Sequence, residues 1–352
     1  MSGDMPAGDS QKWINVALQG GGAHGAFTWG VLDRLLEDGR IAFEAISGTS
    51  AGAMNAVAVA DGFMKDGEDG AQQALEDFWR SVSRSAAMSP VQRSFMDVLM
   101  GSWSLDTSPG YLFFDHLTRM ASPYELNPLN YNPLKELLED QIDFDRVAAC
   151  DRIKLFLSAT NVHTGRVRVF TCAEITPDVV LASACQPHLF QAVEIDGVPY
   201  WDGGYMGNPV LFPFFDSCAS PDVLLIQINP IERKETPRTA REILNRANEI
   251  AFNSSLLKEL RAIEFVARLI DEGKLDPSDY REVLLHRIDG GERLLKLAAS
   301  SKMNAEWSFL LHLHDIGYEA ASEWLEESFE KVGREPSVDI RTLFEGGLGG
   351  GG

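Results

Sequence analysis

Short apolar runs and helical stripes alternate along much of this chain. Runs at residues 14–18, 43–46, 153–160 and 222–228 have the composition of buried strands. Between them apolar side chains recur at helical spacing, for example through residues 26–37. Such alternation is typical of a parallel sheet with helices on both faces. We therefore predict an α/β fold of three α/β/α layers with a mostly parallel sheet.

Two hairpins interrupt the alternation. Residues 166–170 follow the third apolar run across a turn at Gly165, which predicts an antiparallel pair. Asp196-Gly197 is a strong turn signal between two further short strands. The second hairpin would place Asp202 at the end of a strand.

Two regions differ in character from the rest. Residues 83–150 are apolar but broken by turn signals, which predicts either a cap over an acyl-chain pocket or a subdomain packed on the core. Residues after 236 carry long helical stripes that could also form a homo-oligomer contact. We divide the chain into a flexible N-terminus (1–11), an α/β domain (12–235) with an inserted apolar region (83–150), a mostly helical C-terminal region (236–345) and a disordered glycine-rich tail (346–352).

Ser50 stands at the centre of Gly48-Thr49-Ser50-Ala51-Gly52, after an apolar run and before a helical stripe. Glycines allow a sharp strand-to-helix turn that exposes the serine hydroxyl. The N-terminus of the following helix favours the negative charge that develops during acyl transfer. The pattern therefore predicts a nucleophilic serine.

A glycine-rich loop, Gly20-Gly21-Gly22-Ala23-His24-Gly25, follows the first apolar run. Its spacing also fits a dinucleotide-binding loop, but the acidic residue expected downstream would fall near Glu44, inside the next strand. We favour an oxyanion hole formed by the N–H groups of Gly20, Gly21 and Gly22.

Asp202 is followed by Gly203 and Gly204, and Asp-Gly-Gly alone is most often a turn. In this order, however, the glycine loop, the Ser50 elbow and Asp202-Gly203-Gly204 resemble the motifs of the patatin-like phospholipases. Residues 182–187 also look like the family's approach to its aspartate, and the resemblance covers roughly residues 14–229.

The resemblance implies a lipid acyl hydrolase with a serine–aspartate dyad. Ser50 would attack the ester and Asp202 would accept its proton. A carboxylate with an ordinary pKa near 3.9 is a weak base for this step, so Asp202 must be desolvated and bonded to Ser50. The remaining motif residues, Ala23, His24, Gly25, Gly48, Gly52, Gly203 and Gly204, would support this geometry.

His24 departs from the family pattern, which usually has Arg or Lys at this position. A neutral histidine would orient the loop only weakly at pH 7. Two alternatives remain open. In the first, the imidazolium form of His24 raises activity near pH 6, provided that the pKa of Asp202 lies below that of His24. In the second, which we favour, His24 is a packing and loop-positioning residue.

Other mechanisms and functions remain open. A Ser-His-Asp triad would take its base from His286, His312 or His314, which follow Asp202 in the chain. His163 and His188 are interpreted as wall or surface residues. The chain could also be a lipid-binding regulator with a vestigial site, or an acyltransferase that uses the same acyl-enzyme.

Composition narrows the choice of partners. The net charge of −21 argues against nucleic acid and against electrostatic docking on anionic lipid. Any membrane contact must therefore be transient and hydrophobic, or made with neutral or zwitterionic surfaces. The four cysteines form no C-x-x-C pair, so we expect buried free thiols, no metal and no cofactor. Neither a signal peptide nor a membrane span is evident, which predicts a cytoplasmic protein.

Overall fold

The computed structural model describes residues 11–276 and 279–345. The predicted glycine-rich tail and nearly all of the predicted flexible N-terminus lie outside the described residues.

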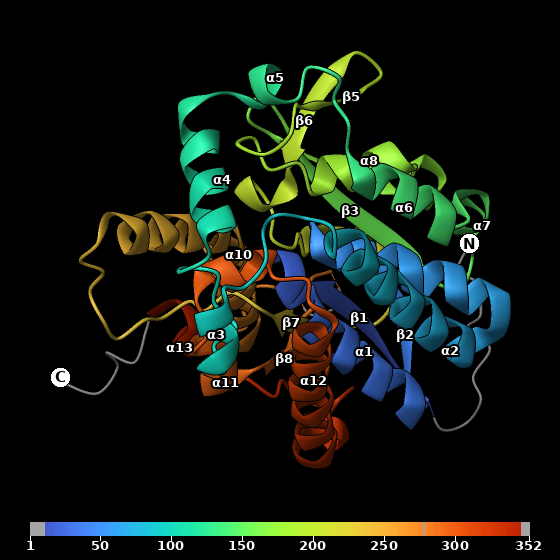
Figure 1. Cartoon of the computed structure of the whole chain (residues 1–352). Helices are drawn as coiled ribbons and strands as arrows, with labels where there is room; N and C mark the ends of the chain where they lie inside the picture. The colour runs from blue at the N-terminus through green and yellow to red at the C-terminus, as the bar shows by residue number, and fades with distance from the viewer. Residues whose placement is uncertain (1–10, 277–278, 346–352) are drawn as a thin grey trace.

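An eight-stranded, mostly parallel sheet forms the centre of the molecule (Figure 1). Its order is β5-β6-β3-β2-β1-β7-β8, with β4 also paired to β3. The pairs from β3 through β8 are parallel, and both predicted hairpins, β3–β4 and β5–β6, are antiparallel. The strands are β1 Lys12–Leu18, β2 Ile41–Gly48, β3 Lys154–Asn161, β4 Val167–Thr171, β5 Val193–Ile195, β6 Val198–Asp202, β7 Asp222–Gln227 and β8 Leu284–Asp289.

Helices cover both faces of this sheet, as the sequence predicts. The helix α2 has non-helical backbone at Asp66 and Gly67. The α-helices are α1 Gly25–Asp38, α2 Ala51–Ala86, α3 Phe95–Leu99, α4 Pro109–Met120, α5 Pro123–Leu126, α6 Pro133–Gln141, α7 Phe144–Ala148, α8 Pro177–Ser183, α9 Phe212–Ser217, α10 Ala240–Asp271, α11 Gly291–Leu295, α12 Trp307–Ser328 and α13 Ile340–Glu345. The short 3₁₀ helices are η1 Gly22–His24, η2 Cys172–Glu174, η3 Gly203–Tyr205, η4 Ala299–Met303 and η5 Phe329–Lys331.

The core has two halves, one on each face of the sheet. Along β1, Val16 and Leu18 belong to the half that packs with α1, α2 and α12. Ala17 points to the other half, which includes Leu256 of α10. This alternation follows from the period of two in a strand. It confirms the three-layer α/β/α arrangement.

The C-terminal region is mostly helical and is joined closely to the core. Its strand β8 extends the sheet beside β7 in parallel. Its helix α12 packs on α1, where the Trp29 and Trp307 ring centroids lie 5.8 Å apart. His314 Nε2 also lies 2.9 Å from Asp33 Oδ2 across the same pair of helices.

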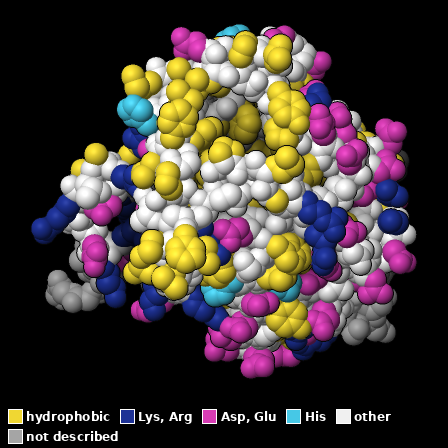
Figure 2. Space-filling view, viewed as in Figure 1, with side chains coloured by type: hydrophobic (Ala, Val, Ile, Leu, Met, Phe, Trp, Pro, Cys, Tyr) yellow, Lys and Arg dark blue, Asp and Glu magenta, His cyan; other side chains and the backbone are white. Residues whose placement is uncertain are grey.

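The insertion at residues 83–150 folds into α3 to α7 and leaves many apolar side chains exposed. Helix α4 has no buried residue. Phe113 of this helix is 69% exposed, and Leu99 of α3 is 68% exposed. Figure 2 shows hydrophobic side chains gathered around a hollow on the face that carries α4 and α5. Throughout the described residues, no helix combines the length and apolar character needed to cross a membrane.

Candidate active site

Ser50 occupies a strained turn between β2 and α2. Its φ is 55° and its ψ is −120°, a backbone conformation that non-glycine residues rarely adopt. A Cβ at Gly52 would collide with the carbonyl oxygen of Leu18, so this turn requires glycine at that position. The Ser50 N–H donates to Ser183 Oγ at 2.9 Å, which ties the elbow to the end of α8. The turn therefore has the geometry of a nucleophile elbow.

The glycine loop lies directly against this elbow. A Cβ at Gly20 would stand 2.7 Å from Ser50 Cβ, a separation that only glycine permits. The Gly20 N–H donates to Asn208 Oδ1 at 2.7 Å. This N–H is therefore already bonded to a side chain of the protein. The sequence had instead predicted that it would help to hold the oxyanion. Gly21 and Gly22 also line the cavity that contains Ser50.

Asp202 ends β6 and is fully buried beside the elbow. Its Oδ1 accepts the Gly204 N–H at 2.7 Å, and its Oδ2 accepts Gln186 Nε2 at 2.7 Å. Burial raises the pKa of Asp202 to about 6, opposed by hydrogen bonds from Gly204, Gln186 and the Ser50 hydroxyl. A carboxylate in this setting is a stronger base than an exposed one.

His24 is buried and uncharged in this arrangement. Its Nε2 lies 2.8 Å from Ser301 Oγ of η4. Burial lowers the pKa of His24 to about 3, and the positive charges of Lys302 and Arg233 lower it further. The expectation that an imidazolium could raise activity near pH 6 is therefore wrong. His24, itself part of the glycine loop, packs against η4.

The three histidines considered for a triad have other partners. His286 is buried in β8, where its Nε2 lies 2.9 Å from Asp222 Oδ1. His312 stacks on Trp103, and His314 contacts Asp33. In the described part of the chain, none of the three lines the cavity with Ser50.

Glu44 does not have the surroundings of a ribose-binding residue. Its carboxylate accepts the backbone N–H groups of Ala219 and Ser220 at 2.7 and 2.8 Å. It also accepts Lys154 Nζ at 3.0 Å. These bonds hold the start of β7 to the sheet, which leaves no support for the dinucleotide alternative.

A cavity of about 480 Å³ opens at Ser50. Part of its lining is apolar, as the binding of an acyl chain requires, and comes from Phe78 and Trp79 of α2 and from Leu189. Of residues 83–150, Leu134 is the one that the described lining includes, so the insertion covers little of this cavity, which favours the subdomain over the cap. The opposite wall comes from the C-terminal region through Asn245, Asn248, Glu249, Phe252, Ala299, Lys302, Met303 and Ala305.

Sequence reasoning missed the polar residues that hold this site in place. Gln186 lies in the segment that resembled the family, but its bond to Asp202 was not foreseen. Asn208 and Asn229 follow Asp202 in irregular segments with no motif of their own. Lys302 lies in a segment without any sequence signal.

Fold and site together define an α/β protein with a serine elbow facing a glycine loop and a buried aspartate. The family model for patatin-like phospholipase matches residues 16–215, so the chain belongs to the patatin-like phospholipase family. Membership of this family implies lipid acyl hydrolase activity. No curated protein matches the chain.

The solved structures that are similar to this chain include the following two. One is VipD from Legionella pneumophila, with 16% sequence identity and a TM-score of 0.42, covering 90% of this chain and 67% of that one. The other is ExoU from the type III secretion system of Pseudomonas aeruginosa, solved in complex with SpcU. It has 15% identity and a TM-score of 0.29, with 88% of this chain and 53% of that one covered. The chain therefore spans about two thirds of VipD and about half of ExoU.

Proposed function

We propose that this protein hydrolyses acyl esters of lipid-like substrates through an acyl-serine intermediate on Ser50, with Asp202 as the base. The observation that supports this most directly is the environment of Asp202. Its carboxyl is buried, its pKa is raised to about 6, and the Ser50 hydroxyl is close enough to be one of the groups that oppose this shift. A base must be within hydrogen-bond reach of the proton that it takes and must have a suitable pKa.

The reaction would proceed in two halves. The Ser50 Oγ attacks the ester carbonyl as its proton passes to Asp202, and the N–H groups of Gly21 and Gly22 hold the oxyanion. The protonated Asp202 then gives its proton to the leaving alcohol as the C–O bond breaks. Water attacks the acyl-serine while Asp202 takes its proton, and the return of a proton to Ser50 Oγ releases the carboxylic acid.

The test is the Ser50→Ala variant assayed on short p-nitrophenyl esters. We expect kcat/KM to fall by at least about a thousand-fold, as for the loss of a catalytic serine elsewhere. Ser254→Ala is the matched control, because the Ser254 hydroxyl bonds only to Ala251 of its own helix. If Ser50→Ala keeps activity within a few-fold of wild type, the nucleophile assignment is wrong.

We also propose that the insertion contacts a neutral or zwitterionic lipid surface. The exposed Phe113 and Leu99 support this, and the net charge of −21 disfavours anionic lipid. Phe113→Asp should weaken co-sedimentation with phosphatidylcholine vesicles. Phe265→Asp, in α10 and 50% exposed, should not. Equal binding by both variants would contradict this contact.

A further inference from the structure

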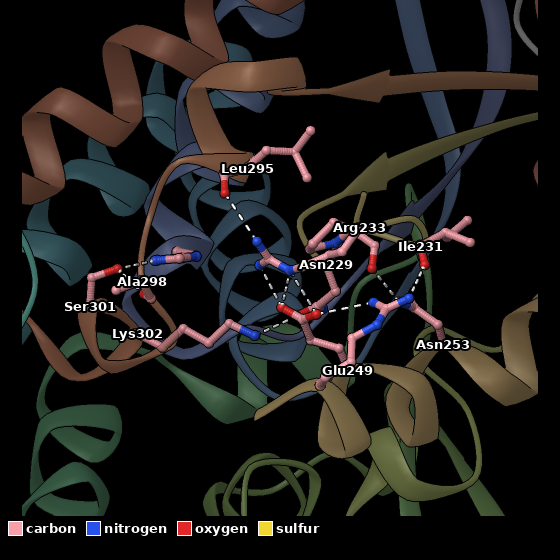
Figure 3. Close-up of polar contacts among 12 residues, drawn as sticks. Asn229, Ile231, Arg233, Glu249, Asn253, Leu295, Ala298, Ser301 and Lys302 are labelled. Carbon is pink, nitrogen blue, oxygen red and sulfur yellow. Dashed lines mark hydrogen bonds and ion pairs between the residues drawn. The ribbon is translucent and has the colours of Figure 1, made fainter. Parts of the chain in front are cut away.

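Lys302 and Glu249 line the C-terminal wall of the Ser50 cavity, and they belong to a cluster of basic side chains around one carboxylate (Figure 3). Arg233, Arg246 and Lys302 surround a single carboxylate, that of Glu249. The whole chain carries a net charge of −21, so this cluster, with three basic side chains and one carboxylate, reverses the prevailing charge locally. Three cations around one carboxylate leave positive charge beside the cavity.

The two arginines already have their partners. Arg233 pairs with Glu249 through Nη2 at 2.6 Å, and its Nη1 donates to the Leu295 carbonyl oxygen at 3.1 Å. Arg246 Nη1 donates to Glu249 Oε2 at 3.1 Å, and its Nη2 donates to the Ile231 carbonyl oxygen at 2.8 Å. The Glu249 carboxylate is thus held by both guanidinium groups.

Lys302 differs from these arginines because it has no carboxylate of its own. Its Nζ donates to the neutral amide oxygen Asn229 Oδ1 at 2.7 Å. Among the described residues, no carboxylate lies within ion-pair distance of this partly buried ammonium. Burial lowers the pKa of Lys302, and Glu249 opposes that shift only at a distance. Removing an ammonium even partly from water without an anion is costly, so Lys302 has an unmet demand for a negative partner.

The position of Lys302 relates it to the reacting centre. Asn229 Oδ1 accepts the hydrogen bond from Lys302 Nζ, and Asn229 Nδ2 donates to the Gly20 carbonyl oxygen at 2.7 Å. Gly20 in turn lies against Ser50. The ammonium is therefore connected through one amide side chain to the loop that faces the nucleophile, in the same cavity.

We propose that Lys302 is the centre of an anion subsite in the Ser50 cavity, which binds a phosphate or carboxylate group carried by the acyl-ester substrate. This inference rests on the proposed function and names the substrate class, an anionic acyl ester such as an acylated glycerol phosphate. Such a group would give Lys302 the anionic partner that the protein does not provide. A neutral glyceride would leave the ammonium without one.

The experiment compares two substrates that differ only in the anionic group, 1-oleoylglycerol 3-phosphate and 1-oleoylglycerol. Lys302→Met should lower kcat/KM for the phosphate ester roughly tenfold or more relative to the neutral ester, the size of a charge-assisted hydrogen bond. Lys302→Arg should restore most of the preference. Lys296→Met is the control, because Lys296 is exposed and pairs with Glu292 outside the cavity.

Equal losses on both substrates would overturn the proposal, because they would mean that Lys302 acts on the oxyanion or on folding. An unchanged preference in Lys302→Met would overturn it as well.

Two measurements on the wild type keep the proposal testable if Lys302→Met does not fold. sn-Glycerol 3-phosphate should compete with the neutral ester, whereas glycerol should not. Inorganic phosphate should also compete, but more weakly than sn-glycerol 3-phosphate. If phosphate inhibits without competing with the ester, the anion binds at a separate site, and the proposal is overturned. If neither ester is hydrolysed, the proposed function fails. Calorimetric binding of glycerol 3-phosphate then decides the subsite alone, and absence of binding overturns it.

Discussion

The two walls of the Ser50 cavity are built in different ways. One wall is the glycine loop and the serine elbow, which are short connections after the neighbouring strands β1 and β2. The other wall comes from α10 and η4, which follow much later in the chain. The shape of the first wall is set by close backbone contacts at its glycines. The surface of the second wall is formed by side chains such as Phe252 and Lys302. The candidate nucleophile thus lies on a turn that is fixed by backbone contacts, whereas much of the cavity lining comes from side chains of a region remote in sequence.

The walls also touch each other. His24 of the loop bonds to Ser301 of η4, and a Cβ at Gly22 would lie 2.5 Å from the Lys302 carbonyl oxygen. The C-terminal region therefore supports the loop as well as lining the cavity.

The largest effect is expected from Asp202→Asn. This change removes the base but keeps a side chain of the same size, so kcat should fall by roughly 10²–10⁴-fold. Asp196→Asn in the exposed β5–β6 turn is the matched control and should retain activity. Ester hydrolysis by purified proteins measures both. A mild Asp202→Asn phenotype, together with loss of activity in His286→Gln, would restore the triad.

Gly20→Ala should be the next most damaging change. Its Cβ would lie 2.7 Å from Ser50 Cβ and 2.8 Å from the Thr49 carbonyl oxygen, so the loop or the elbow must shift. A displacement near 1 Å can lower kcat about 100-fold. Gly39→Ala is a control for strain without a collision, because Gly39 has a positive φ of 69° whereas a Cβ there would meet nothing within 4 Å. Equal kcat values for the two variants would show that the first wall tolerates movement.

The pH profile should show a smaller effect with a defined sign. Asp202 must be ionised to accept the Ser50 proton, and its raised pKa is about 6. The value of kcat/KM should therefore be highest above pH 6 and fall about tenfold per unit below it. His24, with its pKa lowered to about 3, should contribute no rise on the acid side. A rate that increases from pH 7 to pH 5.5 would contradict these assignments.

The smallest effect is expected from Ser301→Ala, which breaks the contact between the walls. His24 Nε2 would lose its buried partner, which should cost about 1–3 kcal/mol of stability. If η4 supports the loop, kcat on neutral esters should also fall a few-fold, and kinetics with thermal unfolding measure the two effects. A destabilised protein with unchanged kcat would mean that the C-terminal wall only packs.

The first wall could be predicted from the sequence because its constraints are local. Glycine is required where a Cβ would collide, as at Gly52, and such positions stand beside the serine that they expose. The alternation of strands and helices, both hairpins and the three layers were predicted for the same reason, since periodicity is a property of neighbouring residues.

The second wall could not be predicted in this way. Lys302 approaches Ser50 only because β8 and α12 pack on the core and place η4 over the glycine loop. That contact depends on the tertiary arrangement, and no spacing in the sequence encodes it. The His24 environment is a similar case, because its pKa depends on burial and on charges that are remote in sequence. For the insertion at 83–150, composition predicts a cap or a subdomain, but it does not reveal which side the apolar residues face.

The central claim is that Ser50 forms the covalent intermediate without help from a histidine. The most direct measurement is labelling with a fluorophosphonate followed by peptide mass spectrometry. The account predicts one adduct, on Ser50, which is absent in Ser50→Ala and unaffected in His312→Ala and His314→Ala. An adduct on a different residue, or no labelling of the folded wild type, would contradict it.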